Sequence, residues 1–304
     1  MKKIFFMLFV LVLLNLTFIF SLDIKINSPN TSKVFNSTRL MFNITTDNSS
    51  LKGDFSYSYD ENPFASIKMC NKAKECVNNI RFNDGPNVLV FRFSDVYGNS
   101  AKKEVNISID SAKPKINSFY KLDKIISNNS KFLINYSESD LENIILYYGR
   151  LKNIKNISKS KTECFNGTGV VCDFTNSLNL SGFDGYPISF WYDISDKANT
   201  ISSSKKIVEV DLTHPKIISS SANPQGLSRV RFVFEIQERN FDEISYLDES
   251  TCEVNVTSGI LCSEIRQGIC VNVKKFCNGD HKLNITVSDK AGNINKTMLN
   301  FTVF

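Results

Sequence analysis

Histidine and tryptophan are scarce in this chain: 304 residues contain two histidines, His214 and His281, and one tryptophan, Trp191. No GxSxG, HExxH, P-loop or Rossmann pattern occurs. Nucleophilic catalysis needs a base beside its nucleophile, but His214 precedes Pro215 and His281 stands at the start of an alternating segment. We expect both histidines to be solvated, in a loop and at a strand edge, and we expect no enzyme activity.

Long runs of like charge are also missing. The formal net charge is +5, and leaving out Lys2 and Lys3 at the extreme N-terminus gives 34 − 31 = +3. A surface without a basic cluster offers no electrostatic footprint for nucleic acid. Hydrophobic residues make up 42% and charged residues 22%, which is typical of a globular chain, and the length suits two or three domains.

The N-terminus carries an export signal. Lys2 and Lys3 precede an apolar run from Ile4 to Phe20, and charge returns at Asp23. This is the layout of a secretory leader with cleavage after Ser21. The length of the run leaves an uncleaved membrane anchor open as the alternative. In both cases residues 22–304 are extracellular or at the cell surface, and the membrane is reached only through residues 1–21.

Eight cysteines fall into neighbouring pairs, which favours disulfides in an oxidising compartment. Zinc is disfavoured because no CxxC occurs. Similar hairpin sequences support four pairings: Cys70–Cys76, Cys164–Cys172, Cys252–Cys262 and Cys270–Cys277. Near the C-terminus the crossed alternative, Cys252–Cys277 with Cys262–Cys270, stays open.

Internal repetition sets the domain organisation. Three segments share a glycine, an alternating strand, a Ser-Asp turn and a second alternating strand; their glycines are Gly85, Gly185 and Gly279, and their turn aspartates are Asp95, Asp196 and Asp289. A period of two indicates half-buried antiparallel strands. Core-facing positions are therefore expected at Leu89, Phe91 and Phe93, at Phe190, Tyr192 and Ile194, and at Leu283, Ile285 and Val287. In these turns we expect the aspartate to cap the turn and Gly98 or Gly292 to supply a positive φ. The second repeat lacks that glycine, and Asn199 is expected to replace it.

The repeat length of about 95–100 residues matches one immunoglobulin-like sandwich. We predict an all-β protein with three tandem immunoglobulin-like β-sandwich domains, at 22–111, 112–211 and 212–304, after the signal or anchor helix at 1–21. The "SDxAGN" turns and the junctions "DSAKPKI" and "DLTHPKI" resemble the Ig-like and cadherin-like repeats of prokaryotic, especially archaeal, cell-surface proteins. The resemblance implies an extracellular module used in stalks, adhesion or envelope architecture.

Carboxylates at the two junctions are the candidate metal ligands. Cadherin-like domains bind calcium between neighbours, and the resemblance implies Asp110 and Asp211 as weak candidates, joined by Glu138 or Glu238. One junction carboxylate is few for a calcium cage of six to eight oxygens, so the favoured interpretation is no metal and no cofactor. The acidic clusters at 138–142 and 238–243 are expected to be solvated turns between strands.

Asparagine sequons are more than twice as frequent as the roughly 6 expected by chance. We expect glycan on several of them: Asn30, Asn36, Asn43, Asn48, Asn106, Asn128, Asn135, Asn156, Asn166, Asn179, Asn255, Asn284, Asn295 and Asn300. Trp191 falls on the outward side of its strand, where an interface or second-sheet contact is favoured over a sugar.

The function most consistent with these features is a non-enzymatic surface protein, acting as a structural stalk or an adhesion module. Its partner is an unknown extracellular protein or glycan. A calcium-stiffened adhesion protein and an accessory subunit of a secreted hydrolase are the alternatives.

Overall fold

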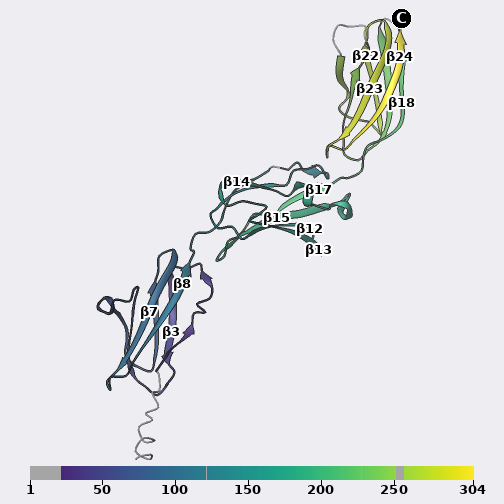
Figure 1. Ribbon diagram of the computed structural model, residues 1–304. Helices are drawn as coiled ribbons and strands as arrows, with labels where there is room; N and C mark the ends of the chain where they lie inside the picture. Colours follow the sequence, from purple (N-terminus) through teal and green to yellow (C-terminus); the bar gives the residue numbers. More distant parts are fainter. Residues whose placement is uncertain (1–21, 121, 227, 251–256) are drawn as a thin grey trace, which may run out of the picture. The chain divides into compact units, whose positions relative to one another are not determined.

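The computed structural model describes residues 22–304 apart from 121, 227 and 251–256. The signal or anchor segment predicted at 1–21 lies outside the described residues. Within them, no helix is long and apolar enough to span a membrane. The described chain folds as tandem immunoglobulin-like β-sandwiches, seen as three groups of strands in Figure 1.

Sandwich 1 has a three-stranded and a five-stranded sheet. The first sheet contains β1 (Ile24–Ser28), β3 (Arg39–Thr46) and β6 (Glu75–Arg81). The second has the order β2 (Val34–Phe35), β8 (Ser100–Ile109), β7 (Gly85–Asp95), β4 (Gly53–Ser58) and β5 (Ile67–Ala73), and the 3-10 turn η1 (Pro63–Ala65) precedes β5.

Sandwich 2 repeats this plan with one additional short strand, β16 (Thr200–Ser202). Its three-stranded sheet contains β14 (Gly167–Asp173), β11 (Leu133–Glu138) and β9 (Lys115–Phe119). The facing sheet has the order β10 (Ile125–Ile126), β17 (Lys206–Val210), β15 (Pro187–Ser195), β12 (Asn143–Arg150) and β13 (Asn153–Ser160), with β16 beside β15. Two 3-10 turns, η2 (Thr175–Ser177) and η3 (Ser181–Phe183), lie between β14 and β15.

Sandwich 3 shows the plan in its simplest form. One sheet contains β18 (Lys216–Pro224), β19 (Arg229–Gln237) and β22 (Ile269–Lys275). The other has the order β21 (Thr257–Cys262), β20 (Phe241–Asp248), β23 (Gly279–Asp289) and β24 (Ile294–Val303). Counting its seven strands along the chain, the first, second and fifth face the fourth, third, sixth and seventh. The main strands of the other two sandwiches have the same order, which is an immunoglobulin-like arrangement.

The alternation of apolar residues explains why these segments pair as strands. In β23, Leu283, Ile285 and Val287 are fully buried, and the residues between them are half-buried on the outer face. The expected core residues of β7 and β15 are buried in the same way. Each sandwich has a separate hydrophobic core: 22–109, 116–212 and 217–303 contain the three clusters.

By its contacts the chain divides into two compact units. One covers the residues up to Lys113 together with Lys197–Asn199, and the other covers Pro114–Asp196 with Thr200–Phe304. The second unit therefore holds the cores of sandwiches 2 and 3.

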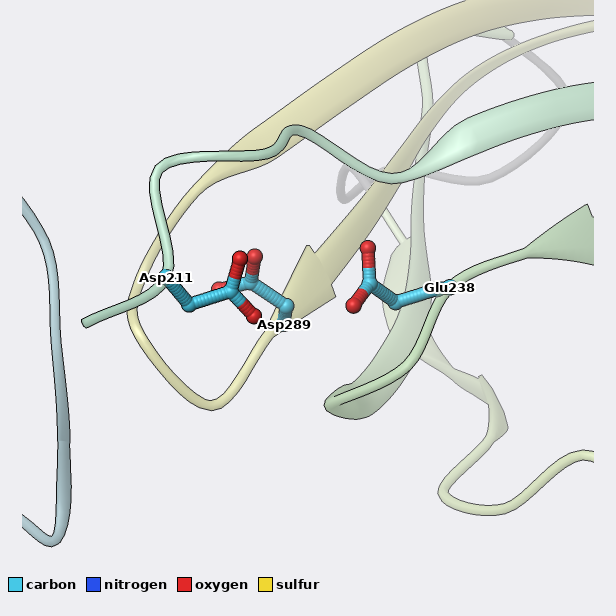
Figure 2. Close-up of side chains that lie close together, drawn as sticks. All are labelled: Asp211, Glu238 and Asp289. Carbon is cyan, nitrogen blue, oxygen red and sulfur yellow. The ribbon is translucent and has the colours of Figure 1, made fainter. Parts of the chain in front are cut away.

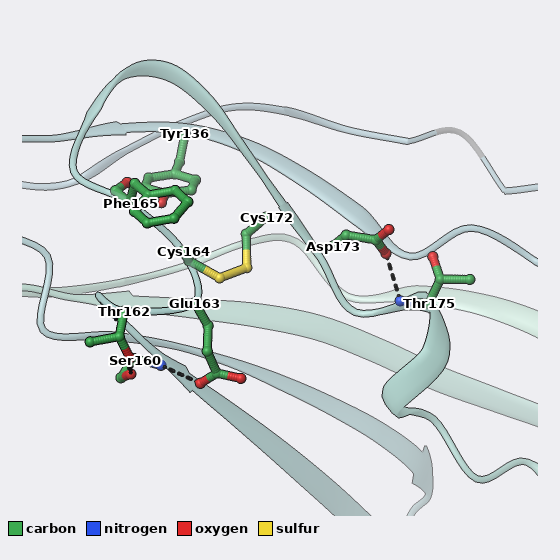
Figure 3. Close-up of a disulfide and its surroundings, with 9 residues drawn as sticks. All are labelled: Tyr136, Ser160, Thr162, Glu163, Cys164, Phe165, Cys172, Asp173 and Thr175. Carbon is green, nitrogen blue, oxygen red and sulfur yellow. Dashed lines mark hydrogen bonds between the residues drawn. A yellow bond between two sulfur atoms is a disulfide. The ribbon is translucent and has the colours of Figure 1, made fainter.

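Three disulfides within the described residues, one in each sandwich, join equivalent strands. Cys70–Cys76 links β5 to β6, Cys164–Cys172 links the loop after β13 to β14, and Cys262–Cys270 links β21 to β22. Each bond thus connects the fourth and fifth strands, which lie at the edges of opposite sheets. Figure 3 shows the second, beside Tyr136, whose hydroxyl donates to the Phe165 carbonyl at 2.5 Å.

The favoured pairings of Cys252 with Cys262 and of Cys270 with Cys277 are both wrong, because Cys262 bonds to Cys270 as in the crossed alternative. Cys277 is also disulfide-bonded, and Cys252 lies outside the described residues. The informative signal was spacing: Cys164–Cys172 and Cys262–Cys270 share a sequence separation of 8.

Candidate functional site

The end of sandwich 2 meets the base of sandwich 3 at three carboxylates, drawn in Figure 2. Asp211 follows β17, Glu238 follows β19 and Asp289 ends β23. One oxygen of each lies within 4.8 Å of the others. Asp211 and Asp289 are buried, at 1% and 2% exposure, and Glu238 is half-buried.

The repeated turn motif positions two of these groups. Asp289 Oδ1 accepts hydrogen bonds from the backbone amides of Ala291 and Asn293, at 2.8 and 2.9 Å, so it caps the turn as expected. The buried Asn293 side chain donates to Asp289 Oδ2 at 2.8 Å and to the Asp211 carbonyl at 2.9 Å. The turn after β23 therefore holds the segment around Asp211 next to sandwich 3.

Side chains from the turn after β19 contact the same group. Asn240 Nδ2 donates to Asp211 Oδ2 at 2.6 Å. Arg239, which is half-exposed, places Nη2 3.4 Å from Glu209 Oε1 and 3.6 Å from Asp211 Oδ2. Arg239 therefore contacts one of the three clustered carboxylates, that of Asp211.

The proximity of these carboxylates affects the protonation of Glu238. Burial raises the pKa of the Glu238 carboxyl, and the negative charges of Asp211 and Asp289 raise it further, although an amide hydrogen bond from Asn240 opposes the shift. In sandwich 2 the pKa of Glu138 is also raised, first by burial and further by the charge of Asp196. Glu138 and Asp196 hold the sequence positions equivalent to Glu238 and Asp289, so the same pairing occurs twice.

Of the two calcium candidates, Asp211 lies in this cluster with Glu238. Asp110, the other candidate, follows β8 directly. Its backbone amide donates to the Phe35 carbonyl at 2.8 Å, and its backbone carbonyl accepts a hydrogen bond from Asn199 Nδ2 at 3.0 Å. Sequence reasoning missed the contribution of Asp289, which it treated as a turn cap alone. The signal was present in the threefold recurrence of that aspartate.

Three other expectations need correction. His281 is buried, because it continues the inward-facing alternation of β23; its Nδ1 lies 2.7 Å from Asp248 Oδ2, and its ring stacks on Phe301. His214 is exposed, as expected. Glu138 is buried rather than solvated, and its Oε1 accepts from the amides of Ser139 and Asp140.

Asn199 is the third correction, since it is absent from the described residues with positive φ, whereas Gly98 and Gly292 have φ of 87° and 82°. Its side chain instead donates to main-chain carbonyls, including that of Ala112 at 2.8 Å. The amide group, rather than a left-handed backbone, is what this turn uses.

Most sequon asparagines are accessible to a modifying enzyme. Of the 13 in the described residues, Asn43, Asn135 and Asn284 are half-buried and the other ten are exposed. Asn255 lies outside the described residues. Glycan occupancy stays a prediction.

No protein-family model and no curated protein matches this chain. Some solved structures resemble the chain at low identity. Chicken CNTN1 FN1-FN3 domains share 7% identity over 93% of this chain and 98% of that one, with a TM-score of 0.40. Titin domains A168-A170 share 9% over 92% and 98%, with a TM-score of 0.39.

A Ca2+-stabilized adhesin that helps an Antarctic bacterium bind ice shares 12% identity over 93% of this chain and 73% of that chain, with a TM-score of 0.34. These similarities concern tandem β-sandwich architecture. With identities this low and TM-scores below 0.5, we take no ligand, partner or activity from them.

Proposed function

We propose that this protein is an extracellular, non-enzymatic module of the cell surface that serves adhesion or spacing. The observation that carries the proposal is that three β-sandwich cores, each with a disulfide at the same place, occupy 22–304. Disulfides persist in oxidising compartments, and the two histidines are engaged at separate places: His281 with buried Asp248, and His214 with the Ile294 carbonyl.

Surface labelling of intact cells tests this proposal. An antibody raised against sandwich 3 should label cells before permeabilisation, and mild external protease should remove that label. Labelling that requires permeabilised cells would place the protein inside and overturn the proposal.

Calcium binding at Asp211, Glu238 and Asp289 is a second candidate function, favoured by the cluster itself. Carboxylate oxygens are the ligands that calcium prefers, and six to eight are needed; three carboxylates offer up to six, and neighbouring carbonyls could complete the set. A bound divalent cation would also neutralise two buried carboxylates that have one half-exposed arginine near them.

Calorimetry with calcium and with chelator separates the two candidates. Calcium should raise the unfolding temperature of wild-type protein and have no effect on Asp289→Asn or Glu238→Gln. An unchanged melting profile in wild-type protein would exclude the calcium function and leave the adhesion or spacer function intact.

A further inference from the structure

The outward face of the larger sheet in sandwich 2 carries a stacked aromatic pair. Tyr147 of β12 and Trp191 of β15 are direct cross-strand partners. Their rings are 4.9 Å apart and inclined by only 8°. Both are half-buried. From the sequence we expected Trp191 to contact an interface or the second sheet. In the structure it packs on Tyr147, a neighbour in its own sheet, and both rings stay partly exposed.

An open depression lies near this pair, at the end of the sheet where β12 turns into β13. Gly149 and its strand partner Ser189 both line the depression. Each lies two positions from the aromatic pair, so the two residues are on the same face of the sheet as that pair. A residue with a side chain does not fit at position 149, because its Cβ would lie 2.1 Å from the Asn153 carbonyl oxygen. The depression has a volume of about 650 Å³ and is also lined by Leu151, Asn153 and Ile207. That volume falls in the usual range for small-ligand sites.

Three cations lie beside the aromatic pair and the depression. Arg150 and Lys152 flank the turn between β12 and β13, and Lys205 places Nζ 4.3 Å from the centre of the Trp191 ring. Arg150 lies over the Tyr186 ring at 4.3 Å. Within the described part of the chain, none of these three cations forms an ion pair. Their charges are therefore available to a ligand.

We propose that this face of sandwich 2, formed by Tyr147, Trp191, the Gly149 depression and the three cations, binds an anionic saccharide. A sugar ring has an apolar C–H face that packs on an aromatic surface. Its hydroxyls can hydrogen-bond to Asn153 and Ser189, and its carboxylate or sulfate group complements Arg150, Lys152 and Lys205. The proposal goes beyond the proposed function, because it assigns a ligand to a surface away from Asp211, Glu238 and Asp289. Its failure would leave the adhesion or spacer function standing.

The single tryptophan makes the binding test direct, since Trp191 is the only indole in the chain. Oligogalacturonate titrated into the full-length protein should change Trp191 emission saturably, and dextran sulfate tests the sulfated form of the ligand. The neutral galactan oligosaccharide of matched length should bind at least about tenfold more weakly. Added salt should weaken binding of the anionic probes, since exposed charges are screened.

Variants assign the binding to this face. The triple substitution Arg150→Gln, Lys152→Gln and Lys205→Gln should weaken binding at least about tenfold. Its charge-matched control is Lys25→Gln, Lys33→Gln and Arg39→Gln on sandwich 1, three exposed cations, which should leave binding unchanged. Tyr147→Ala, followed through Trp191 emission, and Trp191→Phe, followed by calorimetry, test the aromatic pair separately from folding, which circular dichroism monitors.

Several results would overturn the proposal. They are no saturable change with either anionic probe, equal affinity for the neutral oligosaccharide, or equal weakening by the two triple variants. Emission changes with phosphatidylglycerol vesicles and none with saccharide would also overturn it, in favour of a membrane-facing surface.

Discussion

At the scale of single residues, the polar groups buried in the sandwiches are held in place by specific partners. His281 and Asp248 are 3% and 2% exposed, and the second ring nitrogen of His281 lies 2.9 Å from the Cys277 carbonyl. A buried carboxylate requires such partners, because removing it from water costs several kcal/mol. The stability of sandwich 3 therefore depends on the His281–Asp248 pair. His281 occupies an inward-facing position of β23, where the alternation would place an apolar side chain.

Removing the ring should show this dependence. We expect His281→Ala to lower the stability of sandwich 3 by about 3 kcal/mol, because Asp248 stays buried without the ring beside it. Hydrogen exchange measured by mass spectrometry reports sandwich 3 separately. The control is His214→Ala at an exposed site, expected to change stability by less than about 0.5 kcal/mol; equal effects of the two substitutions would contradict the buried pair.

Gly149 of sandwich 2 stands where the backbone requires glycine. Gly149 has φ of 137°, and an added Cβ would meet the main chain of Asn153. Gly149→Ala should therefore destabilise sandwich 2 by about 2 kcal/mol or more. Gly182, where a Cβ meets nothing within 4 Å, is the matched control, and Gly182→Ala should change stability by less than about 0.5 kcal/mol. Urea unfolding followed by Trp191 emission reports on this sandwich, and equal costs would be evidence against the close approach.

At the scale of elements, the fourth and fifth strands of each sandwich lie at the edges of opposite sheets and do not pair with each other. A disulfide there limits the unfolded chain locally, and in the chain-entropy model a loop of about nine residues is worth roughly 2.5 kcal/mol. This bond recurs at the same element pair in all three sandwiches, although the sequences around it differ.

Peptide mapping without reduction tests the connectivity in sandwich 3. We expect a cross-linked peptide that contains Cys262 and Cys270, and the variant Cys262→Ser with Cys270→Ser should lose about 2–3 kcal/mol of stability. Recovery of a Cys252–Cys262 peptide instead would show that the pairing derived from hairpin similarity was right after all.

The junction turn should make stability depend on pH. The pKa of Glu238 is raised in the folded protein, so the folded state holds its proton more tightly than the unfolded state does. The resulting stabilisation is present below the ordinary glutamate pKa of about 4.3 and is lost as pH rises through the raised value. As the pH rises from about 4 to about 7, the melting temperature should therefore fall less steeply in Glu238→Gln than in wild-type protein. Exposed Glu104→Gln is the control, and a slope unchanged by Glu238→Gln would contradict the shift.

At the scale of the whole molecule, the repeated alternation was enough to predict the all-β class, the three cores and their inward-facing residues. Alternation works because burial on one face of a strand imposes a period of two. Partners across space could not be read in this way. Asp211, Glu238 and Asp289 meet only because three separate segments end at one place, and the stacking of Trp191 on Tyr147 follows from the register of β12 with β15.

The central claim is that the chain is exported and that each of its sandwiches contains a disulfide. The intact mass of the protein from its own host tests this claim most directly. The sample is alkylated under denaturing, non-reducing conditions before measurement. We predict a chain without alkylated cysteines, consistent with the absence of free cysteines in the described residues, together with mass added by glycan. A glycan-free mass that carries eight alkylated thiols would contradict the account.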